Sequence, residues 1–238
     1  MKIPVVRGLI ERRILVNYTV ELEIIRKLLP KPFRAKVING KAIAGICLIR
    51  LSEVRPKGLP SFIGFGSENG AHRIAVEWDE NGENKEGVYV PRRDTSSIFN
   101  ALVGGRLFPG KHYHAKFNVV EDGGRYLIGF KSSDGTIIKV DATIAENLPK
   151  DSVFKDLKTA SDFFKSGSAG YSPKKEKYEG LLLNTFKWDV KPLDVSNVKS
   201  SFFENKEIFP VGSIRFDNAL LMTNIEHEWW SLPNKVCL

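Results

Sequence analysis

Short turn sequences divide most of this 238-residue chain into segments with the pattern of β-strands. Asn39-Gly40 separates two such segments and is the strongest short-range signal of a β-hairpin. Asp122-Gly123-Gly124 and Asp134-Gly135 divide residues 112–145 into three more. Many antiparallel strands joined by short turns predict a mainly β (α+β) chain, closed into a barrel or sandwich that carries a few short helical insertions.

Two segments interrupt the β-pattern with a helical one. Residues 20–29 fit a short helix that ends before Pro30, and residues 151–165 place their apolar side chains on one helical stripe. No internal repeat, low-complexity tract or clear linker divides the chain. We therefore expect one domain over residues 1–238.

The composition is that of an ordinary globular protein, with 42% hydrophobic and 27% charged residues. No apolar run approaches the ~18 residues of a membrane span, and the N-terminus lacks a cleavable signal pattern. We therefore expect a cytoplasmic protein with no membrane partner. Cys47 lies in an apolar run and is expected to be a small buried hydrophobic residue.

The formal net charge of +8 raises the question of an anionic partner. The lysines and arginines are dispersed, and their local clusters do not alternate with the stacking aromatic residues of nucleic-acid-binding surfaces. A basic surface of this kind more often provides solubility or attracts small anions. We expect no nucleic-acid partner.

The segment Val90-Pro91-Arg92-Arg93-Asp94-Thr95-Ser96-Ser97 points most directly to a site. Two adjacent guanidinium groups stay charged at physiological pH, so their burial requires protein carboxylates or a bound anion. The Asp and hydroxyl residues that follow are typical of helix N-termini, which predicts a short helix over residues 96–102. A helix start beside Arg92 and Arg93 predicts an anion site to which Ser96 contributes.

A second cluster lies on the strand predicted over residues 72–78. Alternation puts Arg73 and Glu77 on one face and His72 on the other. Arg73 and Glu77 are about 13 Å apart along a strand, so each needs a partner from a neighbouring strand, and Glu77 is expected to meet Arg92 or Arg93. Either this face is solvated and carries cross-strand ion pairs, or it lines the inside of a barrel.

Other motifs give weaker signals. His112 and His114 have a spacing found in metal sites, but no local Cys or carboxylate completes a ligand set, so we expect no metal. Glycines on both sides of Arg106 indicate a loop that packs closely on a site, which makes Arg106 a further candidate for the anion. The segment Glu226-His227-Glu228 has acid–base groups but is more typical of a polar-out edge strand.

The usual hydrolase, nucleotide, dinucleotide and zinc-protease motifs are absent from the sequence, and no cofactor is predicted.

Five motifs lie in order along nearly the whole chain. They are Asn39-Gly40-x-Ala42-x4-Cys47-Leu48-Ile49-Arg50, Ser67-Glu68-Asn69-x-Ala71-His72-Arg73, the segment 90–97, Gly104-Gly105-Arg106-x-Phe108-Pro109-Gly110 and Ala219-Leu220-Leu221-Met222. Together they resemble an uncharacterised bacterial family of the acetoacetate decarboxylase-like superfamily. The resemblance implies a single β-barrel or cone-shaped domain with its ligand site inside, and it implies no known reaction.

The resemblance is sharpest at Val90-Pro91-Arg92-Arg93. Acetoacetate decarboxylases carry an aromatic-Pro-Lys-Lys segment whose first lysine forms a Schiff base with the keto acid. This chain is similar there but has arginine at both positions, and arginine keeps the charge without being a Schiff-base nucleophile. Imine chemistry is therefore not expected, and Lys111 and Lys116 are the remaining candidates for it. In this register, Glu68 and Glu77 are the candidates for the superfamily's acidic pocket residue.

The sequence supports three functional hypotheses. In the first, an enzyme or former enzyme binds a small organic carboxylate or other anion inside the barrel. Arg92, Arg93 and Arg73 hold the anion, Glu68 or Glu77 supplies acid–base capacity, and His72 tunes or relays a proton. In the second, a non-catalytic sensor or carrier uses the same cavity. In the third, the cluster is purely structural, with both guanidinium groups of the Arg-Arg pair bound by protein carboxylates. All three are compatible with a homo-oligomer.

Overall fold

The computed structural model describes residues 5–98 and 109–236. Thirteen strands of these residues form one sheet. Their bounds are β1 Val6–Val20, β2 Arg34–Ala35, β3 Val37–Ile38, β4 Lys41–Pro56, β5 Phe65–Glu80, β6 Glu83–Thr95, β7 His112–Asp122, β8 Arg125–Ser132, β9 Ile137–Ile144, β10 Ala169–Lys174, β11 Lys177–Thr185, β12 Lys191–Ser200 and β13 Ile214–Val236. The helical elements are α1 Leu22–Leu28, the 3-10 turn η1 Ser61–Ile63 and α3 Leu157–Lys165. The prediction of a mainly β chain with a few short helices is confirmed.

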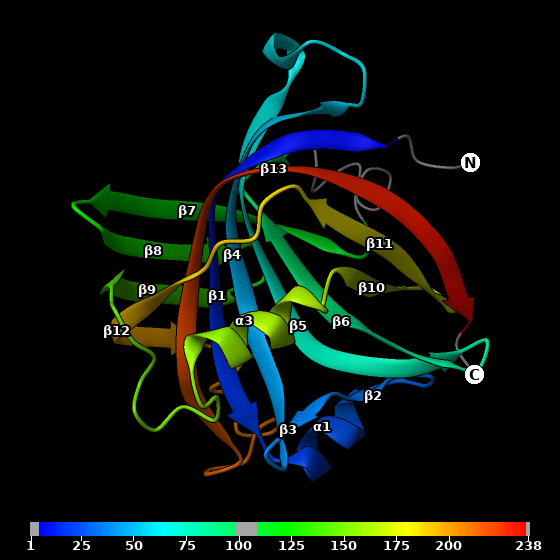
Figure 1. The fold of residues 1–238 in the computed structure, drawn as a ribbon, viewed down its shortest axis with the longest axis vertical. Coiled ribbons are helices and arrows are strands. Elements are labelled where there is room, and N and C mark those ends of the chain that lie inside the picture. Colours follow the sequence, from blue (N-terminus) through cyan, green and yellow to red (C-terminus); the bar gives the residue numbers. More distant parts are fainter. Residues whose placement is uncertain (1–4, 99–108, 237–238) are drawn as a thin grey trace.

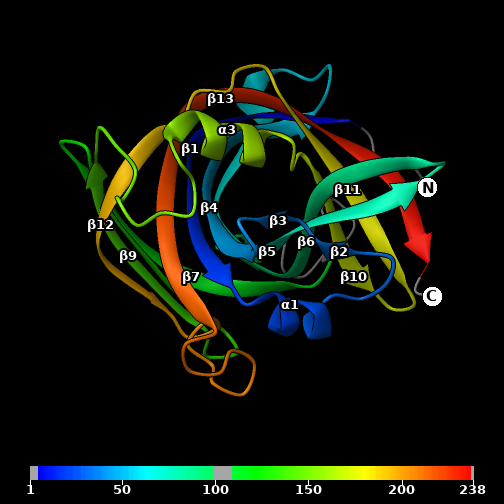
Figure 2. The ribbon, with the colours of Figure 1, turned by 60° about the horizontal axis from the view of Figure 1, so that its bottom comes forward.

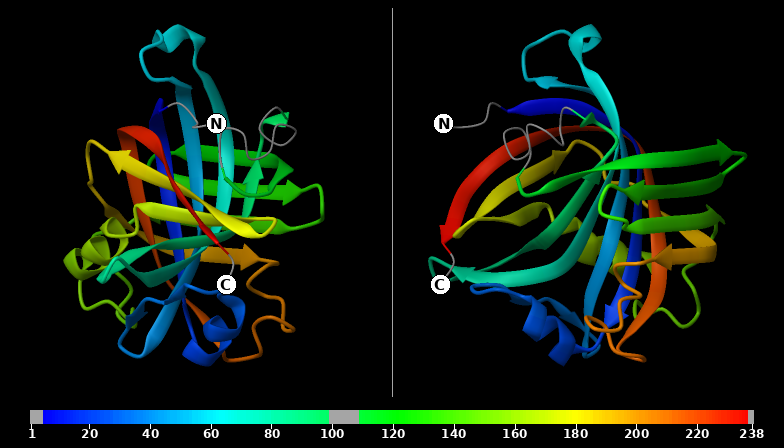
Figure 3. Two further views of the ribbon diagram at one scale, coloured as in Figure 1. Left: turned by 90° about the vertical axis from the view of Figure 1, so that its right-hand side faces the viewer. Right: turned by 180° about the vertical axis from the view of Figure 1, so that it is seen from behind.

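Five antiparallel neighbours, β13, β1, β4, β5 and β6, form what we call the central wall. On one side of the wall, β7, β8, β9 and β12 connect β6 back to β13. On the other side, β10 and β11 make the same connection (Figure 1, Figure 3). We expected a purely antiparallel sheet, but β6 pairs in parallel with both β7 and β10.

Side-chain alternation along the wall separates two hydrophobic cores. On β1, Ile14 and Val16 belong to the first core, which includes residues of β7, β8 and β9. Leu15, between them, belongs to the second core, which includes residues of α3 and β11. On β5, Ile74 and Ala75 divide in the same way. A shift of one residue along a wall strand therefore decides which core a side chain enters.

The Asn39-Gly40 hairpin is confirmed between β3 and β4. Asn39 and Gly40 have φ values of 47° and 76°, the two positive values that a type I′ turn requires. The predicted helix over residues 20–29 is also found, as α1 (Figure 2).

The helix predicted over residues 151–165 is shorter than expected. It begins after Asp156, whose carboxylate caps it by accepting a hydrogen bond from the Thr159 amide. Upstream, Ser152 and Val153 bind the buried carboxylate of Asp217 instead of continuing the helix. Ala160 and Phe164 of α3 are buried, and the helix lies across the second-core face of the wall (Figure 1). No helix in the described ranges is long and apolar enough to cross a membrane.

Candidate anion-binding site

The Arg-Arg segment is part of a strand and does not start a helix. β6 runs through Thr95, and its pairing with β5 continues to the Asn69–Thr95 register. The backbone of Arg92 and Arg93 is therefore committed to the sheet. Ile98, a few residues further on, is helical, and the anion site at the N-terminus of the predicted helix stays a prediction. Most of the helix expected over residues 96–102 lies outside the described residues, as does Arg106.

Arg92 faces the first core and is bound by protein carboxylates. Its Nε and Nη2 donate to Asp94 at 2.9 and 2.6 Å, and its Nη1 and Nη2 donate to Asp134 at 2.5 and 2.9 Å. Its guanidinium carbon also lies 4.1 Å from the centre of the Tyr113 ring. Burial lowers the pKa of Arg92, but the bonds to Asp134 and Asp94 outweigh it and hold that pKa above its ordinary value. Arg92 is therefore bound by two protein carboxylates, as the purely structural hypothesis expects.

His72 is fully buried beside this ion-pair cluster. Its Nδ1 is 3.8 Å from Asp94 Oδ2, and neither ring nitrogen makes a hydrogen bond within the described residues. The ring packs 4.6 Å from the Phe202 ring. Burial and the charge of Arg92 lower the pKa of His72 to about 3, so the imidazole is neutral at pH 7. His72 lies in the first core.

Glu68 belongs to a separate ionic network. It accepts hydrogen bonds from Arg50 Nε at 2.6 Å and from Arg12 Nη2 at 2.5 Å. Glu121 pairs with the same two arginines. The Glu68 backbone amide donates to Ser96 Oγ at 2.9 Å, which ties Ser96 to the sheet. Both predicted site residues are thus engaged with protein groups.

Glu77 is distant from the arginine pair. Its carboxylate accepts from Arg34 Nε and Asn84 Nδ2, each at 3.0 Å. Glu77 lies five residues beyond His72 on β5, and His72 is the residue paired with Arg92, so roughly 16 Å of strand separate Glu77 from the Arg-Arg segment. The predicted contact of Glu77 with Arg92 or Arg93 is wrong.

Arg93 and Arg73 face the opposite side of the wall. Arg93 Nη2 donates to Ser172 Oγ at 3.3 Å, and Arg73 Nη2 donates to Asn17 Oδ1 at 2.5 Å. Arg73 is 5% exposed, and the buried Nε atoms of both arginines have no hydrogen-bond partner among the residues that the structure describes. Burial lowers the pKa of each guanidinium to about 10, so both remain cations at pH 7.

Arg13 is a third arginine on this side that the sequence analysis missed. Its Nε donates to the Cys47 Sγ at 3.4 Å, and its guanidinium carbon lies 5.8 Å from the Trp188 ring centre. None of Arg13, Arg73 and Arg93 forms an ion pair with a carboxylate of the described residues. Side-chain alternation along β1 points to Arg13. Ile14 faces the first core, so its neighbours Arg13 and Leu15 both face the second.

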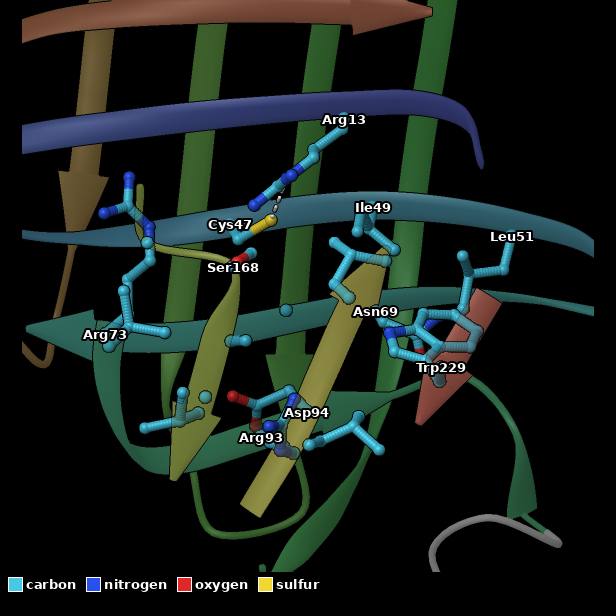
Figure 4. A pocket seen from close by; sticks show the side chains of 18 of the residues that line it. Arg13, Cys47, Ile49, Leu51, Asn69, Arg73, Arg93, Asp94, Ser168 and Trp229 are labelled. Atoms are coloured by element: carbon cyan, nitrogen blue, oxygen red, sulfur yellow. Dashed lines mark hydrogen bonds between the residues drawn. The ribbon is translucent and has the colours of Figure 1, made fainter. Parts of the chain in front are cut away.

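These three arginines line one cavity of about 130 Å³, which we call the arginine pocket (Figure 4). Its wall is otherwise largely apolar and includes Ile49, Leu51, Val88, Val90, Leu181, Leu183 and Trp229. Cys47 is buried as predicted, but it also borders the pocket. Asp94 borders it too, although its carboxylate is bound by Arg92 and Ser132.

The segment after Arg106 reaches the pocket at His112, and Gly110 packs against Ser172. Gly110 has a φ of 90°, and a Cβ there would lie 2.7 Å from the Ser172 Cβ, so only glycine allows this close approach. His112 lines the pocket, and burial together with the charge of Arg93 lowers its pKa to about 4. Gly110 is thus closely packed, while the part of this loop around Arg106 for which close packing was predicted lies outside the described residues.

The lysines considered as imine nucleophiles lie elsewhere. Lys111 is exposed, with its Nζ 4.6 Å from the Tyr113 ring centre, and Lys116 is exposed on β7. No lysine is among the described residues that line the arginine pocket.

Within the described part of the chain, no group of three or more His, Cys, Asp or Glu residues is arranged to hold a metal ion.

Solved structures similar to this chain share its fold over nearly the whole length. Acetoacetate decarboxylase from Legionella pneumophila subsp. pneumophila str. Philadelphia 1 has a TM-score of 0.60 and 11% identity, covering 98% of this chain and 87% of that chain. An acetoacetate decarboxylase-like enzyme from Sphingomonas wittichii RW1 has a TM-score of 0.58 and 10% identity, covering 98% and 94%. The enduracididine biosynthesis enzyme MppR, complexed with pyruvate, has a TM-score of 0.58 and 9% identity, covering 100% and 91%.

The chain therefore has the acetoacetate decarboxylase-like fold, and the resemblance noted in its motifs is confirmed. Identities of 9–11% show a shared fold and not a shared reaction. A model of the DUF2071 family, described as an uncharacterized conserved protein, matches residues 10–213, and the chain belongs to that family. No curated protein matches the sequence.

Proposed function

We propose that this protein binds a small organic carboxylate, or a similar anion, in the arginine pocket. The observation that carries the proposal is the set of three guanidinium groups around one cavity, none of them paired with a carboxylate of the described residues. Arg73 is buried and the other two arginines are half-buried, and burial of a cation without a counter-ion is costly. A carboxylate in the pocket supplies that counter-ion and matches the bidentate geometry of a guanidinium.

The proposal places the ligand on the second-core side of the central wall, where residues of β10 and β11 also line the pocket. A protein with the same fold, MppR, is known in complex with pyruvate, a small organic acid. Arg93 and Arg73 keep the anion-binding role expected from the sequence, and Arg13 joins them. Arg92 and Ser96 instead hold the wall together through protein partners.

The proposed function does not include Schiff-base chemistry. The two positions that resemble the decarboxylase lysines are arginines, and no lysine lines the arginine pocket within the described residues. Arginine does not form an imine with a keto acid under physiological conditions.

A sensor or carrier without catalysis is the second candidate, and one observation favours it. Glu68, His72 and Glu77, the residues expected to move protons, are absent from the lining of the arginine pocket. Proton NMR of a bound carboxylate separates the two functions. An unchanged ligand after prolonged incubation supports the sensor or carrier, and a product signal supports an enzyme.

A thermal-shift screen with small carboxylates tests binding itself. A ligand at about 100 times its Kd adds about 2.7 kcal/mol of stability, which raises Tm by about 5–10 °C in a chain of this size. We expect this rise in the wild type and a smaller one in Arg93→Gln. Arg26→Gln is the matched control, because Arg26 is exposed on α1 and pairs with Glu23. If no carboxylate raises the Tm of the wild type, the proposal is contradicted.

A further inference from the structure

The positive charge of the arginine pocket is divided between two ends. Arg13 and Arg73 also line a smaller cavity of about 30 Å³ beneath α3, next to Phe164 and Gly167, and Arg93 does not. Arg73 stacks 5.0 Å from the Phe164 ring centre, which places its guanidinium at the α3 end.

Arg93 marks the other end, beside β10 and β7. It donates to Ser172 of β10, and a Cβ at Gly110 would lie 4.0 Å from Arg93 Nε. His112 of β7 lines the pocket at this end, where the charge of Arg93 helps to lower its pKa. Figure 4 shows Arg93 apart from the Arg13–Cys47 hydrogen bond.

The wall between the two ends is apolar. Val88 and Val90 precede Arg93 on β6, and Leu181 of β11 lines the same cavity. A single carboxylate at either end leaves at least one buried or half-buried guanidinium without a counter-ion. A single compact dianion, such as phosphate, leaves the apolar wall unused and reaches only one end.

We propose that the ligand of the arginine pocket is a short dicarboxylate, with one carboxylate at Arg13 and Arg73, the other at Arg93, and its aliphatic chain against Val90 and Leu181. This inference rests on the proposed function and specifies its ligand class. The two carboxylates neutralise both ends, and the methylene groups between them bury apolar surface.

Isothermal titration calorimetry with three probes tests the inference on the wild-type protein. Glutarate carries two carboxylates, pentanoate has the same number of carbons and one carboxylate, and inorganic phosphate is a compact dianion. Because a hydrogen bond to a charged group contributes about tenfold or more in affinity, glutarate is expected to bind at least about tenfold more tightly than pentanoate, and phosphate more weakly than glutarate.

Arg93→Gln identifies the second end of the site. Glutamine can still bond to Ser172 but carries no charge, so the glutarate-to-pentanoate preference should fall to within about twofold. Arg26→Gln should keep the wild-type preference. Equal binding of the two acids by the wild type, tighter binding of phosphate, or an unchanged preference in Arg93→Gln overturns the dicarboxylate and leaves the proposed function standing. If the wild type binds none of the three probes, the dicarboxylate fails, and the thermal-shift screen with small carboxylates decides the proposed function separately. Neither result depends on the folding of the variant.

Discussion

Arg92 and Arg93 are neighbours on β6, yet their guanidinium groups lie on opposite faces of the central wall. Arg92 is bound by Asp94 and Asp134 on the first-core side, while Arg93 lines the arginine pocket on the second-core side. The two arginines of one motif therefore have different roles. One completes an ion-pair cluster, and the other is a half-buried cation that lacks a carboxylate partner within the described residues.

This difference predicts opposite effects on stability. Arg92→Ala leaves the Asp94 carboxylate, which is 1% exposed, without its cation, and we expect a loss of about 3–5 kcal/mol in the free energy of unfolding. Arg93→Gln removes a charge that has no counter-ion, so we expect a change smaller than about 1 kcal/mol. Urea unfolding of the wild type and both variants measures this. Equal losses would show that the two arginines have the same structural role.

Burial of His72 predicts a pH dependence of stability. Its pKa is about 3 in the folded protein and about 6.5 when unfolded, so between these values the unfolded chain binds more protons. Its contribution is therefore complete above pH 6.5 and is lost as the pH falls toward 3, by at most about 1.4 kcal/mol per pH unit.

His72→Leu should flatten the fall in unfolding free energy between pH 6.5 and 4 relative to the wild type. Phe202→Leu is the control, because it changes the ring packed on His72 without removing a titrating group. Urea unfolding at several pH values gives the slopes. A wild-type slope that persists in His72→Leu would mean that His72 is not the group that takes up the proton.

Cys47 offers a chemical probe of the arginine pocket. Its sulfur borders the cavity and is bonded to Arg13, so a carboxylate bound at Arg13 should block access to it. We expect glutarate to slow the reaction of Cys47 with iodoacetamide several-fold, and uncharged glutaramide to have no effect. The rate is followed by mass spectrometry of the peptide that contains Cys47. Protection by neither compound, at saturating glutarate, would place the carboxylate elsewhere.

The replacement of lysine by arginine predicts that no imine forms. Incubation with acetoacetate and borohydride should leave the mass of the protein unchanged, because arginine is not a Schiff-base nucleophile. An adduct on any lysine would contradict this, and Lys111 and Lys116 are the first positions to examine in the digested protein.

Local sequence patterns predicted the parts of the fold that depend on neighbouring residues. Alternation separated His72 from Arg73 correctly, because strand side chains point to opposite faces whatever the tertiary structure. The Asn39-Gly40 turn was likewise predicted, since few other dipeptides adopt two positive φ values.

Such local patterns do not predict the partners of the arginines. Asp134 reaches Arg92 from a turn 42 residues away, and the pairing of β6 with β7 and β10 decides what faces Arg93. Arg13 was missed because its place in the pocket depends on β1 lying two strands from β5. Long-range pairing sets these contacts, and a single sequence does not reveal it.

We propose above all that the arginine pocket binds a small organic anion. The most direct measurement is calorimetric titration of glutarate into the wild type and into a variant carrying Arg13→Gln, Arg73→Gln and Arg93→Gln, with circular dichroism to verify that the variant is folded. We expect saturable binding to the wild type and none to the folded variant. Equal affinity in the two proteins, or no binding to the wild type by glutarate or any other small carboxylate, would contradict it.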